Sequence, residues 1–150
     1  MTLRLRPGRA SHSDLQRGEQ GETICRPTMD DEFLSAEGVH ILESWHASED
    51  RQLSIARARL APGQSSQPHR LANTVERYVI VSGSGEVRVG SLPSTPAQPG
   101  DIVYIPAGVR QSIVNTGSVD LVFYCLCSPP FDAADYVSLP DPSADPEACA

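Results

Sequence analysis

GQSSQPHRLANTVERYVIVSG, residues 63–83, decides the fold of this chain. A proline–glycine turn precedes a lone histidine, His69, and Glu76 then lies within an alternating segment that ends at a glycine. Alternation of polar and apolar residues is typical of a β-strand with two different faces, and glycine punctuation is typical of tight turns. The stretch therefore predicts a strand on which Thr74, Glu76 and Tyr78, spaced by twos, point into one cavity.

A second stretch, GDIVYIPAGVRQSIVN at residues 100–115, has the same glycine and proline punctuation. Short apolar or alternating segments surround the two stretches and overlap them, at 39–46, 52–60, 75–82, 85–90, 101–105, 111–115 and 120–127. Many short strands separated by glycine and proline turns are typical of a β-sandwich or a small β-barrel. The sequence contains no internal repeat, so it predicts a single barrel of the all-β class.

The first stretch resembles the first sequence motif of the cupin family. That motif is glycine, five residues, His-x-His, three or four residues, Glu, six residues and glycine. This chain matches it at Gly63, His69, Glu76 and Gly83, with Leu71 in place of the second histidine. The resemblance implies that His69 and Glu76 stand where family members carry metal ligands.

The second stretch resembles the second cupin motif, which is glycine, five residues, Pro-x-Gly, two residues, His, three residues and Asn. The match is at Gly100, Pro106, Gly108 and Asn115, with Gln111 in place of the histidine. Flanking strands extend the resemblance to about residues 39–131. It implies the cupin fold, a double-stranded β-helix or jelly-roll barrel, which we expect over residues 23–137.

Cupins with the full motifs bind a divalent metal through three histidines and one glutamate. Carried over by position, this leaves His69, Glu76 and Gln111 as candidate ligands here. Leu71 cannot bind a metal, and a neutral glutamine carbonyl is a poor ligand for soft ions. We therefore expect either a weakly held divalent ion (nickel, zinc, iron or manganese) or no metal, with the three side chains forming a hydrogen-bonded network.

Two classes of function fit this candidate site. In the first, the protein is an enzyme on a sugar or a carboxylic acid, similar to isomerase, epimerase or oxygenase cupins. His69 is then the general base or the main metal ligand, Glu76 its orienting partner or a second ligand, and Tyr78 the acid. In the second, the barrel binds a small polar molecule without chemistry, or serves as a structural module. The residues alone leave this choice open.

Other side chains are candidates for contact with a small-molecule ligand. Arg57 and Arg59 share one strand face, which is either turned outward and paired with acids or turned inward toward an anionic ligand. Trp45, the only tryptophan, either lines the cavity or belongs to the core or an interface. The full set of candidate substrate-binding residues is Thr74, Tyr78, Arg57, Arg59 and Trp45.

The net charge and composition disfavour several classes of binding partner and reaction. The formal net charge of −7 argues against nucleic acid, because neutralising phosphates requires a basic surface. All basic residues are arginine, so the chain lacks the lysine that Schiff-base chemistry and the phosphate-binding loop require. No apolar run approaches the roughly 18 residues that span a membrane, and no secretory signal is recognisable, so we expect no membrane partner and a cytoplasmic location.

The ends of the chain and its assembly complete these expectations. Residues 1–22 are predicted to be a flexible arm, and residues 138–150, which are acidic and rich in proline, a disordered tail. Strand 39–46 carries apolar side chains on both faces, and cupin barrels commonly pair, so we expect a homodimer. His40 and His46 on that strand are extra imidazoles that could reach the site.

Cys125 and Cys127 lie two residues apart in an extended segment and therefore share one strand face. They are interpreted as small buried hydrophobic residues or, alternatively, as a redox or soft-metal pair. The number and spacing of the cysteines match neither a zinc finger nor a disulfide scaffold.

Overall fold

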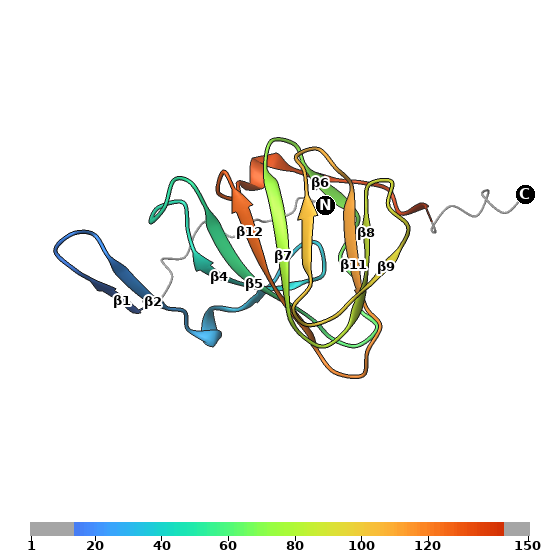
Figure 1. Ribbon diagram of the computed structural model, residues 1–150, viewed down its shortest axis with the longest axis horizontal. Coiled ribbons are helices and arrows are strands. Elements are labelled where there is room, and N and C mark those ends of the chain that lie inside the picture. Colours follow the sequence, from blue (N-terminus) through green and yellow to red (C-terminus); the bar gives the residue numbers. More distant parts are fainter. Residues whose placement is uncertain (1–13, 143–150) are drawn as a thin grey trace, which may run out of the picture.

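The computed structural model describes residues 14–142, and the expectations for residues 1–13 and 143–150 lie outside the described residues. Almost every regular element is a β-strand, joined by two short 3-10 helices (Figure 1). The elements are β1 (Asp14–Arg17), β2 (Thr23–Arg26), η1 (Met29–Asp31), β3 (Phe33–Leu34), β4 (His40–Trp45), β5 (Ser54–Leu60), β6 (His69–Leu71), β7 (Val75–Ser82), β8 (Gly85–Val89), β9 (Thr95–Ala97), β10 (Ile102–Ile105), β11 (Gln111–Asn115), β12 (Leu121–Ser128), η2 (Ala133–Asp135) and β13 (Tyr136–Ser138).

Two antiparallel sheets form the barrel. One has the strand order β10-β7-β12-β5-β4-β3 and the other the order β13-β6-β11-β8-β9. Some neighbouring strands are consecutive in the chain, but β10 pairs with β7 and β11 pairs with β6, and these two pairings bring the two motif stretches together. The expected all-β fold is confirmed, and no helix within residues 14–142 has the length and apolar character needed to span a membrane.

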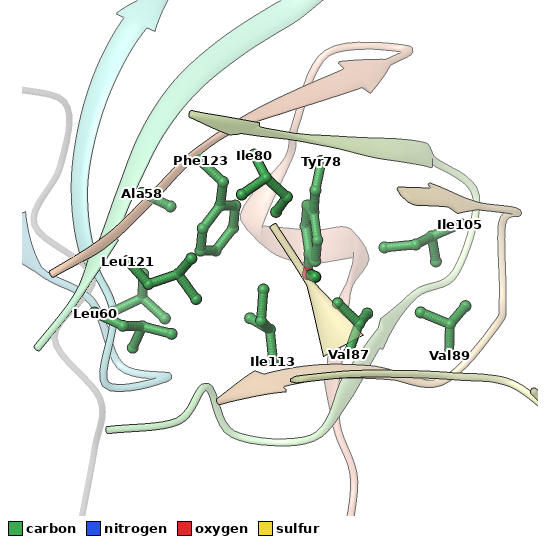
Figure 2. Packing of buried hydrophobic residues seen from close by; sticks show 12 residues of the cluster. Ala58, Leu60, Tyr78, Ile80, Val87, Val89, Ile105, Ile113, Leu121 and Phe123 are labelled. Carbon is green, nitrogen blue, oxygen red and sulfur yellow. The ribbon is translucent and has the colours of Figure 1, made fainter. Parts of the chain in front are cut away.

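The hydrophobic core lies between the two sheets. Figure 2 shows Ile80 and Phe123 of the six-stranded sheet pointing toward Ile113 and Val87 of the five-stranded sheet. Each of these side chains is less than about a tenth exposed and comes from a different strand. Because side chains alternate along a strand, packing one face of each sheet in this way fixes the register of every strand around it.

Strand β7 has the expected register. Glu76, Tyr78 and Ile80 point inward and are buried, whereas Val79 and Val81 lie on the outer face. Gly83 ends the strand with a φ of 80°, and a Cβ there would overlap the Asp120 carbonyl oxygen. Glycine is required at this turn for both reasons, since other residues rarely adopt positive φ.

The N-terminal segment differs from the expected irregular arm. Its described part folds into the β1–β2 hairpin, which projects from the barrel in Figure 1. The second strand of this hairpin, β2, packs beside β4: the Cys25 thiol donates to the Ser44 carbonyl oxygen at 3.2 Å, and Leu42 of β4 is only 3% exposed. The second apolar face of β4, on which we based the expected homodimer, is therefore covered by the chain itself.

Candidate functional site

His69 is the centre of the polar cluster inside the barrel. It lies on β6, is 4% exposed, and its ring stacks on that of Tyr136 with centroids 4.8 Å apart. Its Nδ1 is 2.8 Å from the backbone carbonyl oxygen of Gln67. A carbonyl can only accept, so Nδ1 carries the hydrogen and the lone pair is on Nε2. Burial lowers the pKa of His69, which favours this neutral form.

Glu37, which precedes β4, brings a carboxylate to the same imidazole. Its Oε2 lies 3.3 Å from Nδ1 of His69, and its side chain is 20% exposed. The backbone carbonyl oxygen of Glu37 accepts a hydrogen bond from the backbone N–H of Gln67 at 2.9 Å. Gly38, with a φ of 84°, then turns the chain into β4. Burial raises the pKa of Glu37 to about 7, so this carboxyl is partly protonated at neutral pH.

Glu76 and Gln111 face the interior from opposite sheets. Gln111 pairs with His69 across β11 and β6, and it accepts a hydrogen bond from the buried Tyr78 hydroxyl. Burial raises the pKa of Glu76, and the nearby Gln111 amide opposes this by lowering it. No atom pair between the two side chains meets hydrogen-bond geometry, however, so Glu76 Oε2 and Gln111 Nε2 are both buried without a hydrogen-bond partner.

Two thiols complete the wall of the cluster. On β12, Cys127 is opposite Glu76 and Cys125 is opposite Tyr78, so both face the interior. Burial raises the pKa of both thiols, and the neighbouring Glu76 raises them further. The two side chains are therefore protonated, weakly polar groups beside a carboxylate, which agrees with their interpretation as small buried residues.

The structure does not bring Arg57 and Arg59 to this cluster, which corrects the inward alternative for these candidates. On β5 they alternate with Ala58 and Leu60, which belong to the core, so both guanidinium groups lie on the outer face. There Glu32 pairs with both arginines, at 3.4 Å from Arg57 and 2.6 Å from Arg59. Because Glu32 already pairs with both guanidinium groups on the outer face, Arg57 and Arg59 do not require an anionic ligand.

Several other candidates are also engaged away from His69. Trp45 donates its indole N–H to Asp50 in the loop after β4 at 3.2 Å. His46 lies 3.5 Å from Glu43, and His40 is opposite Arg59 on the outer face. Neither histidine therefore completes the site in this structure.

Thr74 shares the parity of Glu76 and is 3% exposed. Its hydroxyl lies beside Asp135: hydrogen bonds from the Asn73 backbone and then from the Thr74 hydroxyl lower the pKa of that carboxyl. Thr74 thus supports the η2 turn that leads into β13.

The donor set does not fit a firmly held divalent metal. Only Nε2 of His69 and the Glu76 carboxylate are suitably placed, because Leu71 offers no donor and the Gln111 oxygen accepts the Tyr78 hydroxyl. Within residues 14–142, no group of three or more histidine, cysteine, aspartate or glutamate side chains could hold an ion. Metal sites in proteins generally need three or four such ligands.

Sequence reasoning missed two members of this cluster, Glu37 and Tyr136. Both lie outside the cupin motifs and reach His69 only through the fold, Glu37 through its turn and Tyr136 through pairing of β13 with β6. Tyr136 covers the ring of His69, and the side chains of His69, Glu76 and Gln111 are each less than a tenth exposed. The cluster is therefore closed in this conformation.

The fold and the motif residues together define a cupin. The family pattern described as "Cupin domain" matches residues 56–127. The chain is also 34% identical over 87 residues to an oxalate-binding protein of Thermotoga maritima, an alignment that covers 58% of this chain and 70% of that protein. The chain belongs to the cupin family.

Solved structures agree on the fold. KdgF from Halomonas sp. superposes with a TM-score of 0.61 at 20% identity, covering 69% of this chain and 90% of that one. An oxalate decarboxylase superposes with a TM-score of 0.66 at 22% identity, covering 77% of this chain but 32% of that longer one. These likenesses confirm the jelly-roll barrel.

Proposed function

We propose that the cluster around His69 binds a small, uncharged, hydroxyl-bearing molecule without a resident metal. The observation that carries this proposal is the pair of unpartnered buried atoms, Glu76 Oε2 and Gln111 Nε2. An unsatisfied buried polar group costs about 1–3 kcal/mol. Glu76 Oε2 is a hydrogen-bond acceptor and Gln111 Nε2 is a donor. A ligand hydroxyl can therefore satisfy both by donating to Glu76 and accepting from Gln111.

The charges in the cluster favour a neutral ligand over an anion. Glu37 and Glu76 are both acids, and no arginine is among the described hydrogen-bond, ion-pair or electrostatic partners of His69, Glu76 and Gln111. A dianion such as oxalate, placed beside two carboxyl groups, would have no cation to offset its desolvation. Oxalate, the ligand named for the Thermotoga maritima relative, would therefore require an added metal ion in this protein.

Entry to the cluster requires a local movement. Tyr136 lies on the His69 ring, and Glu37 contacts its Nδ1. Either the β13 segment or the turn that carries Glu37 must shift to admit a ligand. Replacement of Tyr136 by alanine should therefore speed association, while leaving Glu76 and Gln111 in place.

Ligand binding by the chelator-treated protein tests this proposal. We expect one or more neutral pentoses or hexoses to bind in calorimetry and to raise the melting temperature, and oxalate to do so only when manganese is added. Glu76→Gln and Gln111→Leu should abolish sugar binding, whereas Arg59→Ala, on the outer face, should not. Metal-free binding of oxalate, or sugar binding that is insensitive to both interior variants, would contradict the proposal.

Acid–base catalysis on such a ligand is a second candidate, favoured by one observation. The Glu37 carboxyl lies 3.3 Å from the imidazole of His69, in a cluster that also contains Glu76. A histidine flanked by carboxyl groups is a common arrangement for proton transfer. Exchange of a sugar's carbon-bound hydrogen with deuterated water, lost in His69→Gln but not in Arg59→Ala, would support isomerase or epimerase chemistry.

A further inference from the structure

A cavity of about 250 Å³ lies on the outside of the barrel, against the five-stranded sheet. Ser112 of β11 is opposite Arg88 of β8, and each stands between two buried residues, so both side chains point outward. Arg110, directly before β11, has the parity of Ser112 and points to the same side. The sheet therefore separates this cavity from His69 and the interior cluster. The polar side chains that line the cavity are Arg88, Ser94, Arg110, Ser112 and Asp141.

The guanidinium group of Arg110 is held in place by a neutral partner. Its Nη2 donates to the carbonyl oxygen of Pro140 at 2.6 Å. Within residues 14–142, no acid lies close enough to Arg110 to form an ion pair with it. A guanidinium has five N–H donors, so the others remain available on a group that the Pro140 contact has already oriented.

Arg88 brings a second cation to the cavity. Its only ion-pair partner among the described residues is Glu86, at 3.8 Å, and the Arg88 side chain is 60% exposed, so this pair contributes little. Arg88 and Arg110 repel each other across the cavity, although acids outnumber basic residues by 19 to 12 in the chain as a whole. An anion between the two arginines would remove this repulsion, and guanidinium groups bind phosphate and carboxylate oxygens well.

Asp141 limits which anion fits. Its carboxylate lines the same cavity and repels an anion that has no proton to share. Carboxylate and sulfate ligands are fully ionised near neutral pH, whereas a phosphate group keeps its last proton until about pH 6 and can donate it. A carboxylate has about four acceptor positions, so Asp141 can accept this hydrogen bond and keep another partner. The tetrahedral shape of phosphate also leaves oxygens for Arg88, Arg110 and the Ser112 hydroxyl.

We propose that this cavity binds the phosphate group of a small molecule, with Arg88 and Arg110 holding its oxygens and Asp141 accepting its remaining proton. The volume of about 250 Å³ is below that of pockets for drug-sized ligands, so the organic part of the molecule is small. The site requires no metal. It lies outside the barrel, so it is independent of the sugar binding proposed for the interior.

Titration of the full chain with inorganic phosphate at pH 6 and constant ionic strength tests this proposal. We expect saturable changes in the ¹⁵N–¹H chemical shifts of the Gly90 and Ser112 backbone amides, which border the cavity. Arg88→Gln and Arg110→Gln should each weaken phosphate binding by about 10-fold or more, because each removes charge-assisted hydrogen bonds. Arg51→Gln is the matched control, because Arg51 is an exposed arginine in the loop after β4 and its substitution makes the same change in net charge.

Sulfate, which has the same shape as phosphate, tests the role of Asp141. Two arginines alone would favour sulfate, because at pH 6 it carries more negative charge than phosphate does. With Asp141 present we expect sulfate to bind about fivefold more weakly than phosphate, since it has no proton to donate to the carboxylate. Asp141→Asn should remove this preference.

Arg88 is mostly exposed, so Arg88→Gln should fold and decides the test if Arg110→Gln, which also loses the Pro140 contact, does not. Shifts that do not saturate, or an equal loss of binding in Arg51→Gln, would overturn the proposal. So would wild-type binding of sulfate as tight as that of phosphate. Phosphate binding that appears only when Asp145 and Glu147 are changed to Asn and Gln would overturn it as well, because the chain's own acidic segment would then be the occupant.

Discussion

Replacement of Glu37 by glutamine should remove part of the pH dependence of folding stability. Burial raises the pKa of Glu37 from its ordinary value of 4.5 to about 7, so the folded protein holds this proton more tightly than the unfolded chain does. The contribution of Glu37 to stability is fully present below pH 4.5 and is lost as the pH rises toward 7. Glutamine has nearly the same shape but does not titrate.

The size of the effect follows from the two pKa values. Each pKa unit corresponds to about 1.4 kcal/mol, so a rise from 4.5 to about 7 corresponds to roughly 3 kcal/mol. The side chain is 20% exposed, so solvent screens part of this effect. We therefore expect about 2 kcal/mol of the wild-type loss in unfolding free energy between pH 4.5 and pH 8 to be absent in Glu37→Gln.

Urea denaturation at half-unit pH steps measures this difference. Titration of His69 and Glu76 affects both proteins, so subtracting the two stability curves isolates Glu37, apart from its electrostatic effect on Glu76. Glu19→Gln, in the exposed turn of the β1–β2 hairpin, is the matched control and should leave the wild-type pH profile unchanged. Parallel curves for wild type and Glu37→Gln would refute the reasoning, because they would mean that the buried carboxyl titrates as in the unfolded chain.

Three further predictions concern the metal, the outer ion pairs and the turn after β7. Protein purified without an affinity tag and dialysed against a mild chelator should hold well below one equivalent of nickel, zinc or iron by elemental analysis. The variants His69→Ala and Glu76→Gln should hold still less. A full equivalent of metal in wild type would contradict our interpretation of the donor set. Glu32→Gln should destabilise the protein to urea by about 1–3 kcal/mol, because it removes the carboxylate that both Arg57 and Arg59 contact, while ligand binding in the interior is unchanged. Gly83→Ala should lower stability by more than about 1 kcal/mol, since alanine must adopt a φ of 80° and displace the Asp120 carbonyl; an unchanged melting temperature would show that this turn relaxes freely.

The motif stretches predict the part of the site that local periodicity determines. Glu76 and Tyr78 are two residues apart on strand β7, so the sequence places them on one face, and in the structure both are buried on the inner face. The spacing of the second motif likewise brings Gln111 opposite His69. Both results depend on strand parity, which a short sequence window contains.

The remaining features depend on packing between distant segments. Arg57 and Arg59 were ambiguous because two arginines on one strand face do not reveal which side the core occupies, and their partner Glu32 is 25 or more residues away. Glu37 and Tyr136 reach His69 from outside both motifs, and no periodic pattern marks them. The closure of the cluster could therefore not be anticipated from the sequence.

Because β13 pairs with β6, the residue that covers His69 comes from a different segment than the residues that form the hydrophobic core. Strand β12 completes the core sheet, and the chain that follows it contributes Tyr136 to the lid over His69 without supplying a residue to the hydrophobic core. Under the proposed function, substitution of Tyr136 should change which molecules fit against the imidazole without removing a residue of the hydrophobic core. Variation in selectivity among close homologues should therefore be concentrated after Ser128, and a library confined to residues 129–138 is the economical way to alter what this barrel accepts.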